Sequence, residues 1–188
     1  MREKYFDNLK YCYLFLAVLF YFYGFFQREN IAGGAEQDFL EFTWPLIISF
    51  KENFFYTLKN YGSFGEGSFP LFHIINAFLN PFVFDQFYFQ GSITFISFLN
   101  FIVLAKIINK RFKITFLDSL IFASVLLFLP FFRSSAYWGI TENLGWLFLV
   151  LSINFYLDYE NKKKNQNSII KIFLVCLFSS LALYTRPY

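Results

Sequence analysis

The chain has 188 residues, of which 57% are hydrophobic, 26% aromatic and only 15% charged, and its mean hydropathy is +0.45. A soluble domain is charged at about a quarter of its residues and would not hide 32 Phe and 13 Tyr from water. Disorder is excluded because it requires low hydrophobicity, and a net charge of +3 gives no support to nucleic-acid binding. The composition therefore predicts an integral membrane protein.

Five apolar runs approach or reach the length of roughly 20 residues that a helix needs to cross a bilayer. After cytoplasmic residues 1–10, we predict spans over 11–26, 85–105, 114–132, 137–159 and 169–186. The first run ends in bulky Tyr and Phe, which disfavours the small-residue cleavage site of a signal peptide. We therefore expect an all-α fold, a polytopic transmembrane helix bundle of about five spans that forms a single membrane domain over 1–188.

The basic residues predict the orientation of the bundle, because Lys and Arg gather in cytoplasmic loops. With the N-terminus inside, the inner segments hold 11 of the 16 basic residues: Arg2, Lys4, Lys10, Lys106, Lys110, Arg111, Lys113, Lys162, Lys163, Lys164 and Lys171. Loops 27–84 and 132–141 then lie outside. Most acids fall on that outer side: Glu29, Glu36, Asp38, Glu41, Glu52, Glu66, Asp85 and Glu142.

The long outer loop 27–84 is too apolar to be a simple connector. Apolar residues recur at helical spacing over about 36–50, which predicts a short amphipathic helix at the membrane interface. Glycines and Pro70 predict a turn-rich loop over 61–70. Residues 71–84 are uncharged, but a full span there would reverse every later loop against the basic pattern. We therefore predict an interfacial or re-entrant helix for 71–84.

Four segments together resemble the GT-C superfamily of membrane glycosyltransferases, such as the dolichyl-phosphate-mannose mannosyltransferase type. They are 33–39 (GGAEQDF), 68–75 (SFPLFHII), 137–144 (YWGITENL) and 183–188 (LYTRPY). The resemblance implies transfer of a sugar from a polyprenyl-phosphate donor to an acceptor on the outer face of a bacterial cytoplasmic membrane. Such enzymes usually have eight or more spans, so we expect this chain to be the N-terminal portion of a longer protein.

The resemblance also implies roles for particular residues. Asp38 is the expected general base, with Glu36 as its neighbour or substitute, because a carboxylate can take the proton of an attacking hydroxyl. Arg133 and Arg186 are the expected phosphate binders, since a guanidinium fits phosphate oxygens. The alternatives stay open: Glu36 and Asp38 also suit a helix N-terminus, and both arginines also suit snorkelling to lipid headgroups.

Three further polar residues stand at the ends of apolar segments. Glu142 is expected to orient the donor sugar or to pair with Arg133, with a solvated helix-start acid as the alternative. His73 is a candidate for binding a sugar hydroxyl or phosphate, and otherwise a structural hydrogen bonder. Asp118 is expected to pair with Lys113 or Arg111.

The expected partners are a polyprenyl-phosphate-linked sugar and the lipid bilayer, without nucleic acid. The pattern predicts no His- or Cys-based metal site and no firm cofactor, and it leaves a divalent cation held by carboxylates open. Two other functions compete with the enzyme: a non-enzymatic membrane subunit of polysaccharide assembly, and a transporter component. Convergence of Asp38, Arg133, Glu142 and Arg186 on one outer cavity would favour the enzyme.

Overall fold

The computed structural model describes residues 2–31, 33–64, 69–161 and 168–185. Arg186, the expected phosphate binder, lies outside these ranges, as do Glu66 and the lysines of 162–164. Every regular element in the described ranges is a helix, which confirms the all-α prediction.

The helices follow one another with short connections. In order they are α1 (Arg2–Phe26), α2 (Ala35–Asp38), a π-helix (Phe39–Thr43), α3 (Trp44–Glu52), α4 (Phe54–Lys59), a 3₁₀ turn (Tyr61–Phe64), α5 (Leu71–Leu79), α6 (Gln86–Phe112), α7 (Phe116–Ala123), a 3₁₀ segment (Ser124–Phe128), α8 (Pro130–Tyr137), α9 (Glu142–Asn161) and α10 (Ser168–Thr185).

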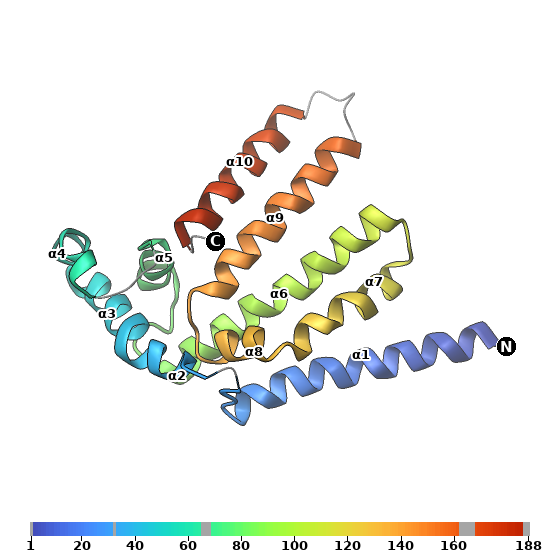
Figure 1. Cartoon of the computed structure of the whole chain (residues 1–188), viewed down its shortest axis with the longest axis horizontal. Coiled ribbons are helices and arrows are strands. Elements are labelled where there is room, and N and C mark those ends of the chain that lie inside the picture. Colours follow the sequence, from blue (N-terminus) through green and yellow to red (C-terminus); the bar gives the residue numbers. More distant parts are fainter. Residues whose placement is uncertain (1, 32, 65–68, 162–167, 186–188) are drawn as a thin grey trace.

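The long helices form a bundle, and the short helices α2 to α5 lie beyond one of its ends (Figure 1). In the bundle, α6 packs against α7 on one side and α9 on the other, and α9 pairs with α10. Helix α1 runs along α7, the following 3₁₀ segment and α8. Helix α3 packs on α5, which in turn contacts the end of α10.

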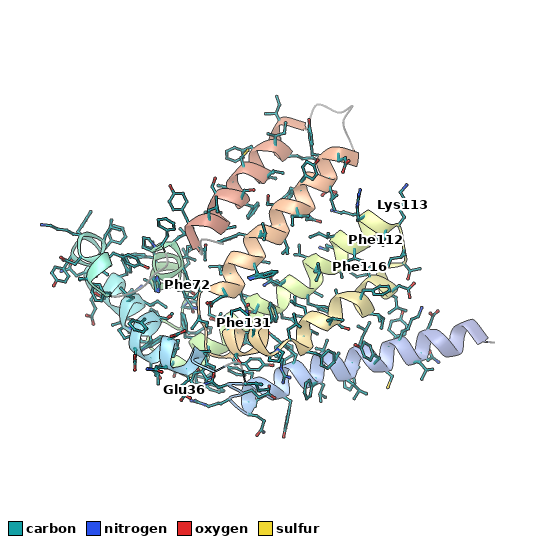
Figure 2. All side chains as sticks on the ribbon, in the orientation of Figure 1. Glu36, Phe72, Phe112, Lys113, Phe116 and Phe131 are labelled. Carbon is teal, nitrogen blue, oxygen red and sulfur yellow. The ribbon has the colours of Figure 1, made fainter. Side chains whose placement is uncertain are left out.

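Within the described residues, two helices are long and apolar enough to cross a membrane: the Asp7–Phe26 part of α1, and α6. A third span results if the bent pair Phe116–Phe128 and Pro130–Tyr137 counts as one. Large apolar side chains point outward along these helices (Figure 2), which suits contact with lipid. The apolar helix Ile169–Thr185 is shorter. The fourth and fifth spans, expected over 137–159 and 169–186, therefore stay predictions.

Helix α6 extends further than the predicted span 85–105. The Asp85 side chain caps its start by accepting a hydrogen bond from the backbone N–H of Tyr88 at 3.1 Å. Its last turn carries Lys110 and Arg111, whose positive charge is favourable at the C-terminus of a helix. Lys113 ends the helix in the left-handed conformation, with φ of 55°. The basic segment is thus helical and not a loop.

The span predicted over 114–132 is not one straight helix, because Phe116–Phe128 and Pro130–Tyr137 meet at a bend of 72°. Leu129 is extended, with ψ of 120°, and Pro130 begins a new helix. A residue before proline is forced out of the helical conformation, and proline is suited to a first helical turn. Pro130 therefore ends one helical segment and starts the next in a new direction.

The predicted partners of Asp118 are wrong. Its carboxylate accepts a hydrogen bond from Lys10 of α1 at 2.6 Å and another from Thr115 at 2.6 Å. Lys110 of α6 pairs with Asp158 of α9 at 2.8 Å. These contacts join the N-terminal part of α1, the α6–α7 connection and the end of α9 at one end of the bundle. The predicted inner segments thus lie together, opposite α2 to α5 (Figure 1).

Candidate functional site

The segment from Phe132 to Gly145 is buried at every position, although it contains many polar residues. It comprises most of α8, the turn that follows and the start of α9. Gly139 makes the reversal possible, because its φ of 67° is a conformation that side-chain-bearing residues rarely adopt. The segment lies at the end of the bundle next to α2, on the predicted outer side (Figure 1).

Side chains from neighbouring helices satisfy the backbone of this buried segment. Asn143 donates a hydrogen bond to the carbonyl of Phe132 at 2.9 Å, and Asn100 donates one to the carbonyl of Asn143 at 3.0 Å. Thr94 donates to the carbonyl of Ala136 at 3.1 Å. Non-helical backbone is tolerated at membrane depth only where protein supplies such partners. These bonds explain how a bent, polar segment stays inside the bundle.

Arg133 is the charged centre of the segment and is only 4% exposed. Its guanidinium forms an ion pair with the carboxylate of Glu29, three residues past the end of α1, at 2.5 Å. Its Nε donates to the Tyr137 hydroxyl at 3.0 Å, and the guanidinium lies 4.2 Å from the centre of the Phe20 ring. The structure thus pairs Arg133 with Glu29, not with Glu142.

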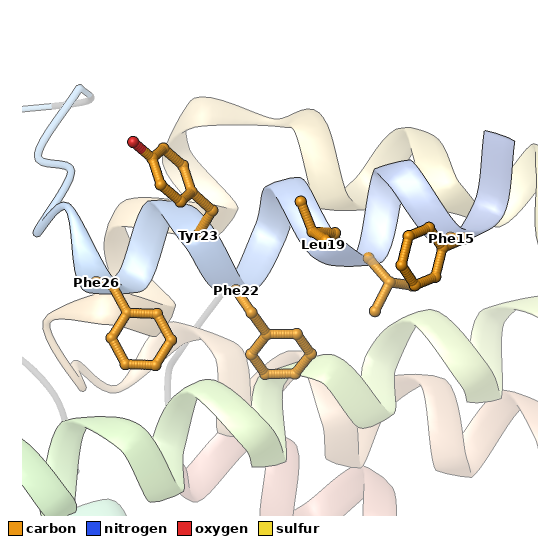
Figure 3. A pocket seen from close by; sticks show the side chains of 6 residues that line it. Phe15, Leu19, Phe22, Tyr23 and Phe26 are labelled. Carbon is orange, nitrogen blue, oxygen red and sulfur yellow. The ribbon is translucent and has the colours of Figure 1, made fainter. Parts of the chain in front are cut away.

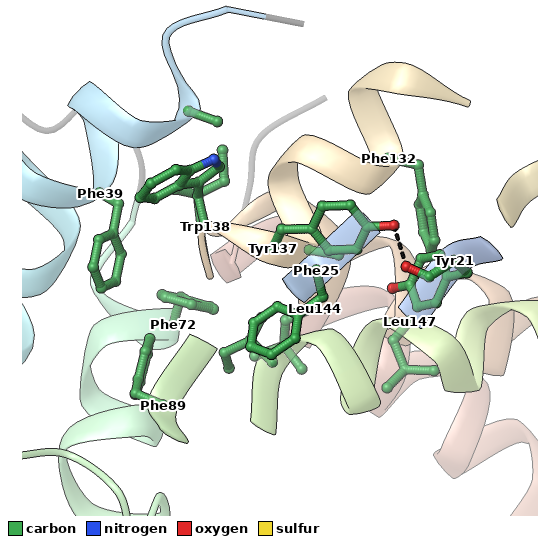
Figure 4. Close-up of a cluster of buried hydrophobic side chains, with 14 of the residues drawn as sticks. Tyr21, Phe25, Phe39, Phe72, Phe89, Phe132, Tyr137, Trp138, Leu144 and Leu147 are labelled. Carbon is green, nitrogen blue, oxygen red and sulfur yellow. Dashed lines mark hydrogen bonds between the residues drawn. The ribbon is translucent and has the colours of Figure 1, made fainter. Parts of the chain in front are cut away.

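The exit of α1 is fixed to the buried segment by further contacts. The Tyr137 hydroxyl donates to the backbone carbonyl of Tyr21 (Figure 4), and Trp138 Nε1 donates to the carbonyl of Glu29 at 3.2 Å. A side chain at Gly24 would overlap the Arg133 guanidinium and lie 2.8 Å from the Tyr137 hydroxyl. A Cβ at this position would therefore displace the Arg133 guanidinium and the Tyr137 hydroxyl from where they lie beside α1.

Glu36 and Asp38, which we call the acidic motif, lie shortly after this exit. Gly33 and Gly34 both have φ above 70° and turn the chain into α2, which carries Glu36 and Asp38. Both carboxylates are exposed. In the ranges that the structure covers, neither takes part in an ion pair or a side-chain hydrogen bond. Glu36 and Asp38 are therefore accessible to a substrate, and Figure 2 shows Glu36 at the outer edge of the short helices.

Aromatic packing joins the acidic motif to the buried segment. Phe39, which follows Asp38, is fully buried and stacks on Phe89 of α6 with ring centres 6.0 Å apart. The Phe89 ring in turn lies against Gly139, 3.1 Å from the position that a Cβ would occupy there. Figure 4 shows Phe39, Phe89 and Trp138 in this one cluster. The motif and the turn between α8 and α9 therefore occupy the same end of the bundle.

Glu142 and His73 are both buried, at 6% and 0% exposure. Glu142 lies in the first turn of α9, inside the buried segment. His73 lies on α5, where its Nδ1 is 3.3 Å from the Tyr61 hydroxyl and its ring meets Phe72 edge-on. Burial lowers the pKa of His73 to about 3, so the imidazole is neutral at physiological pH. Because the ring is fully buried, a sugar would have to uncover it to bind there.

The predicted site residues that the structure describes lie in three neighbouring places. Arg133 and Glu142 share the buried segment, Glu36 and Asp38 are exposed beside it, and His73 is on the neighbouring α5. Two open depressions of about 450 Å³ are apolar, one along the α1 side chains of Figure 3 and one between α6 and α7. Among the described residues, no group of three or more His, Cys, Asp or Glu is arranged to hold a metal ion.

Sequence reasoning placed Glu29 among the outer acids but gave it no role. The sequence did contain a hint of the pairing: Glu29 lies about one turn past the first predicted span, and Arg133 is an isolated arginine at the outer end of another. Comparison with known proteins assigns no function to these residues, because no family model, curated protein or solved structure matches the chain.

The first prediction concerns the Glu29–Arg133 ion pair. Glu29→Gln should lower the free energy of unfolding by about 3–5 kcal/mol, because it leaves the buried Arg133 guanidinium unpaired. Arg133→Met should lower it less, because the Glu29 side chain that it leaves unpaired is 20% exposed. The double variant should lose much less free energy of unfolding than the two single variants lose in sum. Unfolding of the purified protein in detergent measures all three changes. Glu52→Gln, which alters an exposed glutamate at the end of α3, is the control and should have little effect. Additive losses would contradict the pairing.

The second prediction concerns His73, the single histidine of the chain. The native state holds it neutral, with a pKa of about 3 instead of 6.5, so the unfolded state binds its proton first as pH falls. The stability should therefore be greatest above pH ~6.5 and decline below it, by at most about 1.4 kcal/mol per pH unit from this group. Thermal unfolding at pH 7.5 and 5.0 should show a larger loss for the wild type than for His73→Gln. Equal losses of stability in the two proteins would mean that the native state does not hold His73 neutral.

Proposed function

We propose that this chain is a membrane module of a GT-C-type glycosyltransferase, which moves a sugar from a polyprenyl-phosphate donor to an acceptor outside the membrane. The observation that carries the proposal is the place of the acidic motif. Two accessible carboxylates, Glu36 and Asp38, stand beside a buried polar segment at the end of a bundle with two or three candidate spans. Polar groups at the edge of an apolar bundle suit a substrate with a polar head and a lipid tail.

In the proposed reaction, the acceptor hydroxyl attacks the anomeric carbon of the sugar. A carbon–oxygen bond forms there, the bond from that carbon to the phosphate oxygen breaks, and the polyprenyl phosphate leaves with the electron pair. Asp38 takes the proton of the hydroxyl, a contribution of about 10²–10⁴-fold to the rate. Glu36 is two residues from Asp38 on the same helical turn, so the two carboxylates point in different directions. Glu36 is therefore the neighbour of the base or its substitute.

The leaving phosphate requires positive charge or hydrogen-bond donors. Arg133 is neutralised by Glu29 in the structure, so a phosphate would have to replace the Glu29 carboxylate to reach it. Arg186 is the other candidate and lies outside the described residues. Within the proposal, Glu142 orients the donor sugar from the start of α9, and His73 offers a neutral ring for a hydroxyl.

The third prediction tests this function. Sugar transfer from a polyprenyl-phosphate donor, measured with the full-length gene product in membranes, should fall by about 10²–10⁴-fold in Asp38→Asn. Asp7→Asn is the matched control, because it makes the same change at the opposite end of the bundle, and its activity should equal the wild type. Unchanged transfer in Asp38→Asn would remove Asp38 as the base. A wild type without transfer would remove the enzyme proposal.

A further inference from the structure

A group of mostly exposed apolar side chains lies apart from the candidate site, on α4 and α5, with the half-buried Phe54 among them. Phe54 meets Phe55 edge-on with ring centres 5.3 Å apart, and it meets Phe78 of α5 at 5.8 Å. Leu79 follows Phe78. Phe55 is 81% exposed and Leu79 is 76% exposed, so these side chains have no partner helix covering them in the described chain. We call Phe54, Phe55, Phe78 and Leu79 the α4–α5 edge.

The α4–α5 edge lies close to the outer start of a candidate membrane span. Helix α5 ends at Leu79, and α6, which is long and apolar enough to cross a bilayer, begins at Gln86. Phe82 and Tyr88 meet at 5.8 Å around that start, and both are exposed. Aromatic rings concentrate at the level where the hydrocarbon core gives way to the headgroups. The start of α6 thus marks this level, one short connection away from the edge.

The other side of α5 is tied to an apolar helix as well. Helix α5 contacts α10, and Phe69, just before α5, meets Tyr184 near the end of α10 with ring centres 5.5 Å apart. Leu183 and Tyr184 are themselves exposed. Exposed apolar side chains therefore stand at both ends of α5, with Leu79 before the start of α6 and Phe69 against Tyr184 of α10. Figure 1 shows α5 beside the end of α10 and α4 further out, at the side of the bundle and not over its centre.

The charged residues beside the edge suit contact with a membrane surface. Lys51 Nζ lies 5.8 Å from the centre of the Phe78 ring, and Lys59 is exposed at the end of α4. Glu52 is the exposed acid between them. Lysines keep their aliphatic stems on apolar surface and extend their ammonium groups toward water and phosphate. Exposed rings together with such lysines are typical of helices that lie in the headgroup region.

We propose that the α4–α5 edge inserts into the headgroup region of the outer leaflet and anchors the outer helices to the lipid surface. The anchor does not depend on the proposed function. It gives the chain from α2 to α5 two fixed points, the α1 exit at Glu29 and the bilayer at α4–α5. The acidic motif on α2 is joined to both, which keeps Glu36 and Asp38 near the membrane surface.

Collision measurements on spin labels test the anchor. Labels at Phe55→Cys and Leu79→Cys, each in a chain with Cys12→Ser and Cys176→Ser, are examined in nanodiscs of phosphatidylcholine and phosphatidylglycerol. Oxygen concentrates in lipid, whereas a nickel chelate stays in water. The ratio of oxygen to nickel collisions should be several-fold higher at both positions than at Gln37→Cys, an exposed position on α2. Both substitutions replace exposed side chains, so the fold should remain, as the melting temperature checks.

Three results would overturn the anchor. Nickel access at Phe55→Cys and Leu79→Cys equal to that at Gln37→Cys would place the edge in water. Low access of both reagents would mean that protein covers the edge. Broadening of the label spectra that disappears on dilution with unlabelled chain would identify that protein as a second copy. Either labelled position decides the question if the other variant fails to fold.

Discussion

The ion pair between the partly buried Glu29 and the buried Arg133 is the contact on which the outer end of the structure depends. Two charges removed from water are tolerated only when they are paired and their remaining donors are satisfied. Here Arg133 also meets Tyr137 and the Phe20 ring, and the backbone of Glu29 accepts from Trp138. The pair thereby joins the exit of α1 to the bent segment of α8. Because the acidic motif begins only a few residues after Glu29, the pair also sets where Glu36 and Asp38 lie.

The bend at Pro130 brings polar residues into the bundle. Their backbone needs hydrogen-bond partners there, and side chains within the bundle supply them. The side chains of Asn100, Asn143 and Thr94 donate hydrogen bonds to backbone carbonyls of this segment. A continuous apolar helix would need none of these donors and would carry its polar residues only at its ends. The bend therefore explains why a charge-poor chain holds Arg133 and Glu142 together in one buried segment.

The sequence predicted some parts of this structure because they depend on local pattern alone. Hydropathy predicted α1 and α6, and apolar spacing predicted helix over 36–50, where α2, the π-helix and α3 are found. It missed the break at Pro130 because apolar composition outweighed the one local signal. It also misassigned Asp118, whose partner Lys10 is 108 residues away and can be identified only once α1 packs beside α7. Glu29 was overlooked for the same reason: hydropathy finds helices but not which of their ends meet.

The most direct test of the central role of the ion pair is the distance between the acidic motif and α8. Spin labels at Gln37→Cys and Phe131→Cys, both exposed positions, report this distance in a chain with Cys12→Ser and Cys176→Ser. If the pair fixes the exit of α1, the distance distribution is narrow in this chain, broadens when Glu29→Gln is added, and stays narrow with Glu52→Gln. A distribution that Glu29→Gln leaves unchanged would show that the position of the acidic motif does not depend on the pair.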